Sequence, residues 1–151
     1  DMCIRNKTAI ILIGIPASGK SSFCIERLSA FKRINLDTLH TRNKEKLLLQ
    51  DCFEKQESFV VDNTNPTAED RKRYIKPAIE HGYRIVGYYF KSVIRECVDR
   101  NEKRDGKAKV PSHVIANIQN KLEMQSYEEG FDELYYVSIE GNEFSIDKWS
   151  D

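Results

Sequence analysis

The stretch GIPASGKSS, residues 14–22, constrains the fold more than any other feature, because it directly follows the apolar run TAIILI at 8–13. Residues 14–21 satisfy G-x-x-x-x-G-K-[ST], and the pattern stands between an expected strand and an expected helix. Glycines let backbone N–H groups turn inward around an anion, and a helix N-terminus adds the positive end of its dipole. A plain strand–turn–helix would explain the glycines and serines but not Lys20. The motif therefore predicts a loop that binds the phosphates of a nucleotide.

The chemistry of such a loop assigns roles to its side chains. Lys20 is expected to reach the β- and γ-phosphates, and the Ser21 hydroxyl to bind Mg²⁺. ATP and Mg²⁺ are thus the expected cofactors. The nucleotide-binding residues expected in this loop are Gly14, Ala17, Ser18, Gly19, Lys20, Ser21 and Ser22.

The rest of the chain alternates between short apolar runs and charged segments with apolar residues at helical spacing. This alternation predicts an α/β fold with a five-stranded parallel sheet and helices on both faces. With the phosphate loop after the first strand, the expected arrangement is that of a P-loop kinase fold, with the strand order 2-3-1-4-5 and a small helical lid. At 151 residues, with no linker or repeat, residues 1–151 are expected to form a single domain. The expected strands are 8–13, 31–35, 58–63, 83–90 and 133–139, the expected helices are 20–30, 42–57, 67–82, 92–104 and 111–127, and the polar tail from residue 140 offers Phe144, Ile146 and Trp149 as anchors.

Composition narrows the classes of function. Basic and acidic residues number 24 each, so any contact with a polyanion must come from a local patch rather than from net charge. No run approaches the roughly 20 apolar residues of a membrane span, and no secretory signal is visible, so we expect no membrane partner. The cysteines Cys3, Cys24, Cys52 and Cys97 lack paired spacing, which favours reduced thiols in a cytoplasmic protein over disulfides or zinc.

Several classes of nucleotide-binding protein share this loop. A GTPase needs an N-K-x-D motif to read guanine, and the sequence has none. Motor and transporter ATPases place an aspartate at the end of a strand to hold the metal's water, and Asp62 could take that role. Length is the stronger argument, because five strands in 151 residues leave room for little beyond a small kinase.

Polar residues follow the second and third expected strands. Asp37 in NLDTLH emerges at the carboxyl edge of a parallel sheet, where a carboxylate can accept the proton of a hydroxyl that attacks the γ-phosphate. An aspartate that caps a helix is the alternative. The third strand ends in Asp62, Asn63, Thr64 and Asn65, which form either a ligand-binding edge or a turn before a capped helix.

Two basic segments are candidates for phosphate contacts. Arg100 and Arg104 lie four residues apart on one helix face before a glycine, which suits a lid that brings arginine charge to the transferring phosphoryl group. A helix surface with salt bridges is the alternative. The trio Arg71, Lys72 and Arg73 by itself is typical of a solvated helix face.

Together these fragments resemble the 5′-hydroxyl polynucleotide kinase family, the P-loop phosphotransferases that phosphorylate nucleic-acid 5′ ends. The resemblance runs from about residue 10 to 137 and depends on GIPASGKSS, NLDTL, VVDNTNP with RKRY, DRNEKR followed by KVP, and YEEGFDELYYV. The loop motif is common, but the ordered set is much more specific.

The resemblance implies that Asp37 is the general base on the acceptor 5′-OH and that residues 62–65 line the acceptor side. It also implies that Arg104 is the lid arginine on the phosphates, with Arg100 as its neighbour on ATP. Relatives often have an arginine before the base, where this chain has Leu36. They also have an arginine a few residues later to hold the acceptor's 3′-side phosphate, for which His40, Arg42 and Lys44 are the candidates here.

Three functions are compatible with this sequence. The first is ATP-dependent phosphorylation of a DNA or RNA 5′-OH end by a kinase domain without phosphatase or ligase modules, with separate repair enzymes as potential partners. The second is a small-molecule kinase for a nucleoside, sugar or antibiotic, and the third is a nucleotide-binding module without transfer activity. The basic residues Arg42, Lys44, Arg71 and Arg73 favour the polynucleotide, because a small neutral acceptor would not need them. The sequence does not indicate an oligomeric state.

Overall fold

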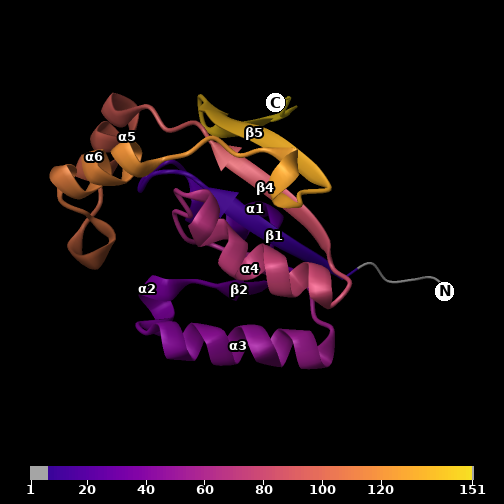
Figure 1. The fold of residues 1–151 in the computed structure, drawn as a ribbon. Helices are drawn as coiled ribbons and strands as arrows, with labels where there is room; N and C mark the ends of the chain where they lie inside the picture. Colours follow the sequence, from indigo (N-terminus) through magenta and orange to yellow (C-terminus); the bar gives the residue numbers. More distant parts are fainter. Residues whose placement is uncertain (1–6, 151) are drawn as a thin grey trace.

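The computed structural model describes residues 7–150, apart from the side chain of Lys107. A central sheet runs through the molecule, and helices cover both of its faces (Figure 1). The strands lie in the order β2-β3-β1-β4-β5-β6. In the described part of the chain, they are β1 (Thr8–Ile13), β2 (Lys32–Ile34), β3 (Phe59–Val61), β4 (Arg84–Phe90), β5 (Glu133–Glu140) and β6 (Glu143–Lys148).

The first five strands have the expected order and are all parallel. The expectation of exactly five parallel strands was wrong, because the tail after residue 140 turns back and forms β6 antiparallel to β5. Gly141, at φ 66, allows the tight reversal between Glu140 and Glu143, which pair across the turn. The tail also alternates apolar and polar residues from Phe144 to Asp147, a strand pattern that its polarity obscured.

The helices are placed close to their expected positions, with differences at their ends. The helix expected to reach residue 127 stops at Lys121, and a four-residue helix that was not expected follows β2. The capping box expected at Thr67 and Asp70 is present, with both of its hydrogen bonds formed. The α-helices are α1 (Lys20–Arg27), α2 (Leu36–Leu39), α3 (Arg42–Lys55), α4 (Ala68–Glu80), α5 (Ile94–Glu102) and α6 (Ser112–Lys121), and the short 3-10 turns are η1 (Gly106–Ala108) and η2 (Tyr127–Glu129).

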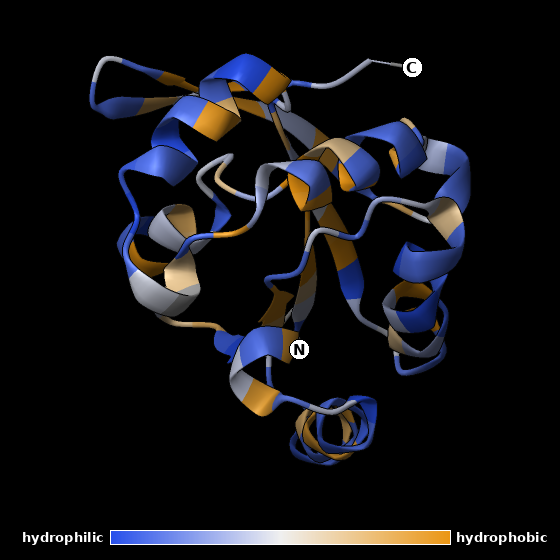
Figure 2. Ribbon diagram, turned by 90° about the vertical axis from the view of Figure 1, so that its left-hand side faces the viewer, coloured by the Kyte–Doolittle hydropathy of each residue, from blue (hydrophilic) through white to orange (hydrophobic). Residues whose placement is uncertain are grey.

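Two hydrophobic cores lie on opposite faces of the sheet because alternate residues of β1 point to opposite sides. Ala9, Ile11 and Ile13 pack with residues of α3 and α4, whereas Ile10 and Leu12 pack with residues of α1. Figure 2 shows the apolar colour concentrated on the central strands and the polar colour on the outer helices. The fully buried central strand holds the loop that follows it in a rigid frame.

A third, small core lies where α5 and α6 project beyond one end of the sheet (Figure 1). Ile15 and Ala17 of the glycine loop pack there with Cys97 of α5 and Ile115 of α6. The two helices, which were expected to form a lid, thus contact the glycine loop directly.

Candidate active site

The loop between β1 and α1 curls around the ammonium group of Lys20. The Lys20 side chain donates to the carbonyls of Gly14, at 2.8 Å, and Ile15, at 2.9 Å, and the residue is only 8% exposed. Ala17, at φ 66, and Gly19, at φ 106, have left-handed backbone conformations, which turn successive N–H groups toward one side of the loop. This is the geometry of a phosphate-binding loop.

Glycine is required at two positions of this loop for different reasons. At Gly14, an added Cβ would lie 2.8 Å from Ser18 Oγ and 3.0 Å from the Cβ of Phe90, so the strand end and the loop would be forced apart. At Gly19, the N-cap of α1, an added Cβ would meet the side chain of Ile139 at 3.0 Å in addition to the backbone strain. Ser18 is buried, whereas Ser21 and Ser22 are exposed at the start of α1.

The charge state of Lys20 is perturbed by its surroundings. Burial lowers the pKa of Lys20 from 10.5 to about 8, because the uncharged amine is favoured away from water. The charge of Arg104 lowers this pKa further, whereas Asp62 and Asp37 act in the opposite direction. Both expected catalytic partners of Lys20 are therefore close enough to influence its ammonium group electrostatically.

Ser21 and Asp62 come together where α1 begins and β3 ends. Ser21 Oγ donates to Asp62 Oδ2 at 3.1 Å, and the Asp62 side chain is only 2% exposed. Arg33 of β2 donates from Nε to the same carboxylate oxygen at 2.8 Å and from Nη2 to Ser21 Oγ at 3.3 Å. A hydroxyl and a carboxylate that share one cationic group form an oxygen donor set suited to Mg²⁺. Sequence reasoning missed Arg33, because the expected neighbourhood of the second and third strands does not say which of their side chains meet.

Mg²⁺ in kinases is held by few protein ligands, because the nucleotide phosphates and water supply the others. Residues 7–150 contain no cluster of three or more His, Cys, Asp or Glu able to hold a metal. The oxygens of Ser21 and Asp62 fit the ion, and the Arg33 guanidinium shows that a positive charge is stabilised beside them.

Asp37 lies on α2, a short helix whose orientation is set by two asparagines. Asn35 caps α2 by accepting from the backbone N–H of Thr38 at 3.0 Å, and its Nδ2 donates to the Asp62 carbonyl at 2.5 Å. Asn63 Oδ1 accepts from the backbone N–H of Leu36 at 2.9 Å. The cap is Asn35, not Asp37, and Asp37 is exposed with no side-chain hydrogen bond to any described residue. Its carboxylate is free to accept a proton from a bound hydroxyl.

The segment 62–65 was expected to line the acceptor side, but the structure divides it among several tasks. Asn65 is buried and donates to the Leu12 carbonyl at 2.7 Å, so it anchors β1 and does not face an acceptor. The carbonyl of Thr64 accepts from the Gly14 N–H at 3.0 Å, which ties this segment to the phosphate loop. Asp62 is directed to Ser21, and Asn63 supports α2. The segment 62–65 therefore holds β1, the phosphate loop and α2 in place.

Arg71 was expected to contact the acceptor, and the structure contradicts this. Its side chain is fully buried, and it pairs with Glu129 through Nε at 2.7 Å and Nη2 at 3.0 Å. Nη1 donates to the carbonyls of Asn65 and Pro66, at 3.0 and 3.2 Å. Arg71 is therefore a structural residue that joins the start of α4 to η2.

The other two expected acceptor arginines, Arg42 and Arg73, are exposed on α3 and α4. Arg42 Nη1 donates to Glu45 Oε1 at 2.8 Å, and Glu45 is itself 2% exposed. Glu45 Oε2 also accepts from the Tyr74 hydroxyl at 2.9 Å and from Asn63 Nδ2 at 3.0 Å. This buried network, which sequence reasoning missed, connects α3 and α4 to the asparagine that holds α2.

Of the two arginines expected in the lid, Arg100 contacts the phosphate loop directly and Arg104 does not. Arg100 Nε donates to the Ala17 carbonyl at 2.7 Å, so α5 is fastened to the loop itself. Arg104 Nη1 donates to the Ala108 carbonyl at 3.0 Å, within the turn that follows α5. Asn101 supports this turn by bonding both the N–H and the carbonyl of Val110, at 2.8 and 2.5 Å.

The described cysteines offer no reactive thiol. Cys24, Cys52 and Cys97 are buried and free, as expected for reduced thiols, and Cys3 lies outside the described residues. Burial raises the pKa of Cys24 to about 12 and that of Cys52 to about 11, so these thiols stay protonated.

A membrane span requires a long apolar helix, and residues 7–150 contain none.

A parallel sheet in the order 2-3-1-4-5, a glycine loop closed around a lysine, and two helices that contact this loop define a P-loop kinase fold. The chain belongs to the AAA domain family, whose sequence model matches residues 44–124.

Two curated relatives match nearly the whole chain. It is 28% identical over 97% of its length to a bifunctional polynucleotide phosphatase/kinase of Schizosaccharomyces pombe. It is 30% identical over 96% of its length to a putative bifunctional polynucleotide phosphatase/kinase of Acanthamoeba polyphaga mimivirus. The chain spans 37% of the length of each of these relatives. The resemblance to polynucleotide kinases expected from the sequence is thereby confirmed.

Other kinases are similar as well. An L-seryl-tRNA(Sec) kinase of Methanococcus maripaludis is 28% identical over 76% of this chain, which spans 52% of that relative. Among solved structures, a gluconokinase from Sinorhizobium meliloti superimposes with a TM-score of 0.59 at 21% identity, over 89% of this chain and 84% of that one. This structural similarity shows that the two proteins share a fold.

Proposed function

We propose that residues 1–151 form one kinase domain that transfers the γ-phosphate of ATP to the 5′-hydroxyl end of DNA or RNA. The observation that carries this proposal is the exposed, unbonded carboxylate of Asp37 on α2, a helix that Asn35 and Asn63 tie to the segment bonded to the phosphate loop. The two curated relatives named as polynucleotide phosphatase/kinases support the choice of acceptor.

In this mechanism, Asp37 accepts the proton of the 5′-hydroxyl as the hydroxyl oxygen attacks the γ-phosphorus. The ammonium of Lys20 exchanges the carbonyls of Gly14 and Ile15 for β- and γ-phosphate oxygens. The N–H groups of the loop and the α1 N-terminus hold the phosphates in line with the acceptor. Transfer breaks the bond between the γ-phosphorus and the β–γ bridging oxygen, and ADP leaves.

In this proposal, the two lid arginines supply positive charge to the phosphates. Arg100, bonded to the Ala17 carbonyl, lies next to the loop that binds ATP. Arg104 influences Lys20 electrostatically and is the residue we assign to the transferring phosphoryl group. Ser21 and Asp62 would hold Mg²⁺, which, when bound, neutralises charge on the β- and γ-phosphates.

A small-molecule kinase is the second candidate. The similarity of this fold to a gluconokinase favours it, because the same sheet and loop can serve a compact acceptor. A module without transfer activity is disfavoured, since it would have no use for both an exposed, unbonded Asp37 carboxylate and a buried Lys20 in the phosphate loop.

Radiolabelled ATP separates these candidates. The protein is offered 5′-hydroxyl oligonucleotides of DNA and RNA and, in parallel, nucleosides and gluconate. We expect label on the oligonucleotides, and label on nucleosides or gluconate alone would contradict the proposal.

Asp37→Asn tests the base itself. We expect at least a hundredfold loss of kcat with ATP affinity kept within threefold, because general base catalysis contributes about 10²–10⁴. Asp147→Asn, an exposed aspartate on β6, is the matched control and should retain full activity. Turnover of Asp37→Asn within tenfold of wild type would refute the assignment.

A further inference from the structure

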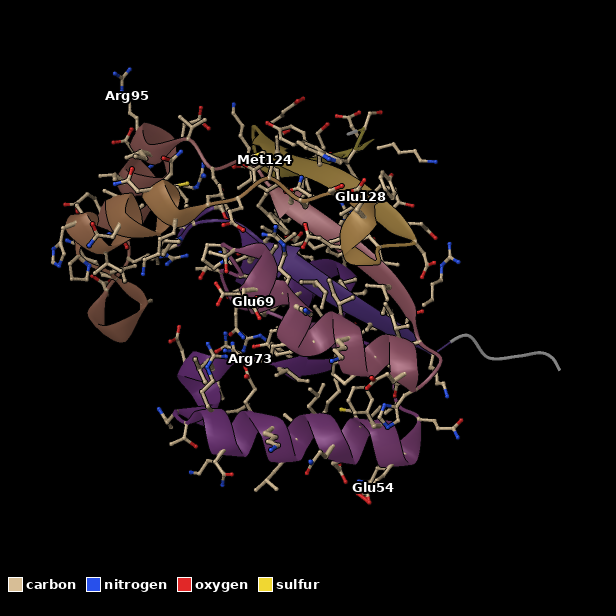
Figure 3. The ribbon with its side chains drawn as sticks, in the orientation of Figure 1. Glu54, Glu69, Arg73, Arg95, Met124 and Glu128 are labelled. Carbon is tan, nitrogen blue, oxygen red and sulfur yellow. The ribbon has the colours of Figure 1, made fainter. Side chains whose placement is uncertain are left out.

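A cavity of about 450 Å³ lies between α3 and α4, away from the phosphate loop. Its volume falls in the range of small-ligand sites, about 300–1,000 Å³. In Figure 3, Arg73, one of the residues that line the cavity, lies between α4 and the layer formed by α2 and α3. Ten residues line the cavity: Arg42, Glu45, Lys46, Leu49, Gln50, Phe53, Arg73, Tyr74, Pro77 and His81.

The lining combines an apolar floor with a cationic rim. Leu49 and Phe53 are 7% and 8% exposed, so the floor is buried side chain rather than open surface. The exposed His81 ring stacks on Phe53 with a centroid separation of 4.2 Å and an interplanar angle of 1°, which extends the aromatic surface to the rim. Such a surface is suited to a flat, apolar ring system.

The rim carries positive charge without a negative counterpart. Glu45 is the only carboxylate among the lining residues, and its ion pair with Arg42 neutralises it. Lys46 and Arg73 are exposed and form no ion pair with any described residue. The charge complementarity of the cavity is therefore to an anion.

The cavity is connected to the proposed acceptor side. Arg42 begins α3, three residues after α2 ends at Leu39. Glu45 in the cavity wall bonds Asn63 at 3.0 Å, and Asn63 in turn bonds the backbone N–H of Leu36 at 2.9 Å. The part of the cavity lined by Glu45 is therefore tied to α2, the helix that carries Asp37.

We infer that this cavity binds the acceptor strand beyond its 5′-terminal nucleotide, with a nucleobase against Leu49, Phe53 and His81 and backbone phosphates on Lys46 and Arg73. The inference rests on the proposed function, which it deepens by giving the enzyme a site that selects a polynucleotide over a lone nucleoside. Base stacking and phosphate contacts of this kind are tolerant of sequence.

Acceptor length provides the test. The KM and kcat of the wild-type protein are measured with a 5′-hydroxyl nucleoside 3′-phosphate and with di-, tri- and tetranucleotides. We expect KM to fall about tenfold or more from the mononucleotide to the trinucleotide, because stacking of one base in an aromatic site contributes about this much. A constant KM over this series would overturn the inference.

Two variants at exposed positions remove the cavity's contributions without disturbing the core. Lys46→Gln/Arg73→Gln should raise KM for the trinucleotide at least fivefold. Its slope of log KM against log salt concentration should be smaller by about 1.4 than that of wild type. Its KM for the mononucleotide should stay within twofold of wild type. Gln50→Trp fills the cavity and should abolish the dependence on length. Lys55→Gln/Lys76→Gln removes the same charge from the same helices outside the cavity and should behave as wild type.

The outcomes separate this inference from the proposed function. If the protein phosphorylates none of the oligonucleotides, both the proposed function and this inference are overturned. Phosphorylation of oligonucleotides with a length dependence that persists in Gln50→Trp and in Lys46→Gln/Arg73→Gln would leave the proposed function intact and overturn the inference alone.

Discussion

The lowered pKa of Lys20 predicts that nucleotide binding takes up a proton near pH 8. In the nucleotide-free protein this pKa is about 8, because the buried ammonium group has lost its water. The negative charge of a triphosphate stabilises the ammonium, so its pKa in the complex should return to 10.5 or above. The protein should therefore bind about 0.5 proton with ATP at pH 8 and about 0.9 at pH 9.

The same shift sets the size of the effect on affinity. ATP must bind the fraction of protein in which Lys20 is protonated or supply the free energy of protonation. Affinity should fall about eightfold between pH 7.5 and 9, which is about 1.3 kcal/mol. The free energy of unfolding should respond in the opposite direction, since the unfolded chain binds more protons between the folded pKa of about 8 and the unfolded value of 10.5. In this window the contribution of Lys20 to stability rises with pH.

Calorimetric titration with ATP at pH 8.5, in buffers of different ionisation enthalpy, measures the proton uptake directly. The apparent binding enthalpy should vary linearly with buffer enthalpy, with a slope of about 0.8 proton. Lys20→Arg keeps the positive charge but does not titrate in this range, so its slope should be close to zero. Equal slopes for the two proteins would refute the assignment of the proton to Lys20.

Three further predictions follow from single contacts. Arg71→Leu should lower the free energy of unfolding by about 3 kcal/mol in urea titrations, because it leaves Glu129 without its partner. Glu129→Gln should lower the free energy of unfolding by less, because the glutamine can still form neutral hydrogen bonds with Arg71. Gly87→Ala should cost about 1–3 kcal/mol in the same assay, since the new Cβ would lie 2.6 Å from the side chain of Leu134, and an unchanged midpoint would contradict this packing. Arg33→Gln should tighten Mn²⁺ binding to the ATP-free protein about five- to tenfold, because the variant removes a cation that competes for Asp62. Titrations followed by electron paramagnetic resonance measure this affinity, and an unchanged affinity would argue against the competition.

Local sequence patterns were sufficient for the central strand and the phosphate loop. The run 8–13 is apolar at every position from residue 9 and is followed by a loop whose lysine has no purely structural explanation, so both features were predictable. The capping box of α4 was predictable for the same reason, because its two partners are three residues apart.

Contacts between distant segments were not predictable in this way. Arg33 and Asp62 are 29 residues apart. The expected strand order made β2 and β3 neighbours, but it did not say which of their side chains would meet. The burial of Arg71 did leave a signal that was overlooked, since it shares the spacing i, i+3, i+4, i+7 with Tyr74, Ile75 and Ala78, all of which are buried. Its position on the buried face outweighed its charge.

The two borders of the sheet have a consequence for self-association. β2 is a three-residue strand that carries Lys32 and Arg33, and β6 carries Asp147 and Lys148. An open strand border can template the addition of a strand from a second molecule, and shortness and charge both oppose this. The protein should therefore stay dispersed at concentrations at which a flat, apolar border would nucleate aggregates.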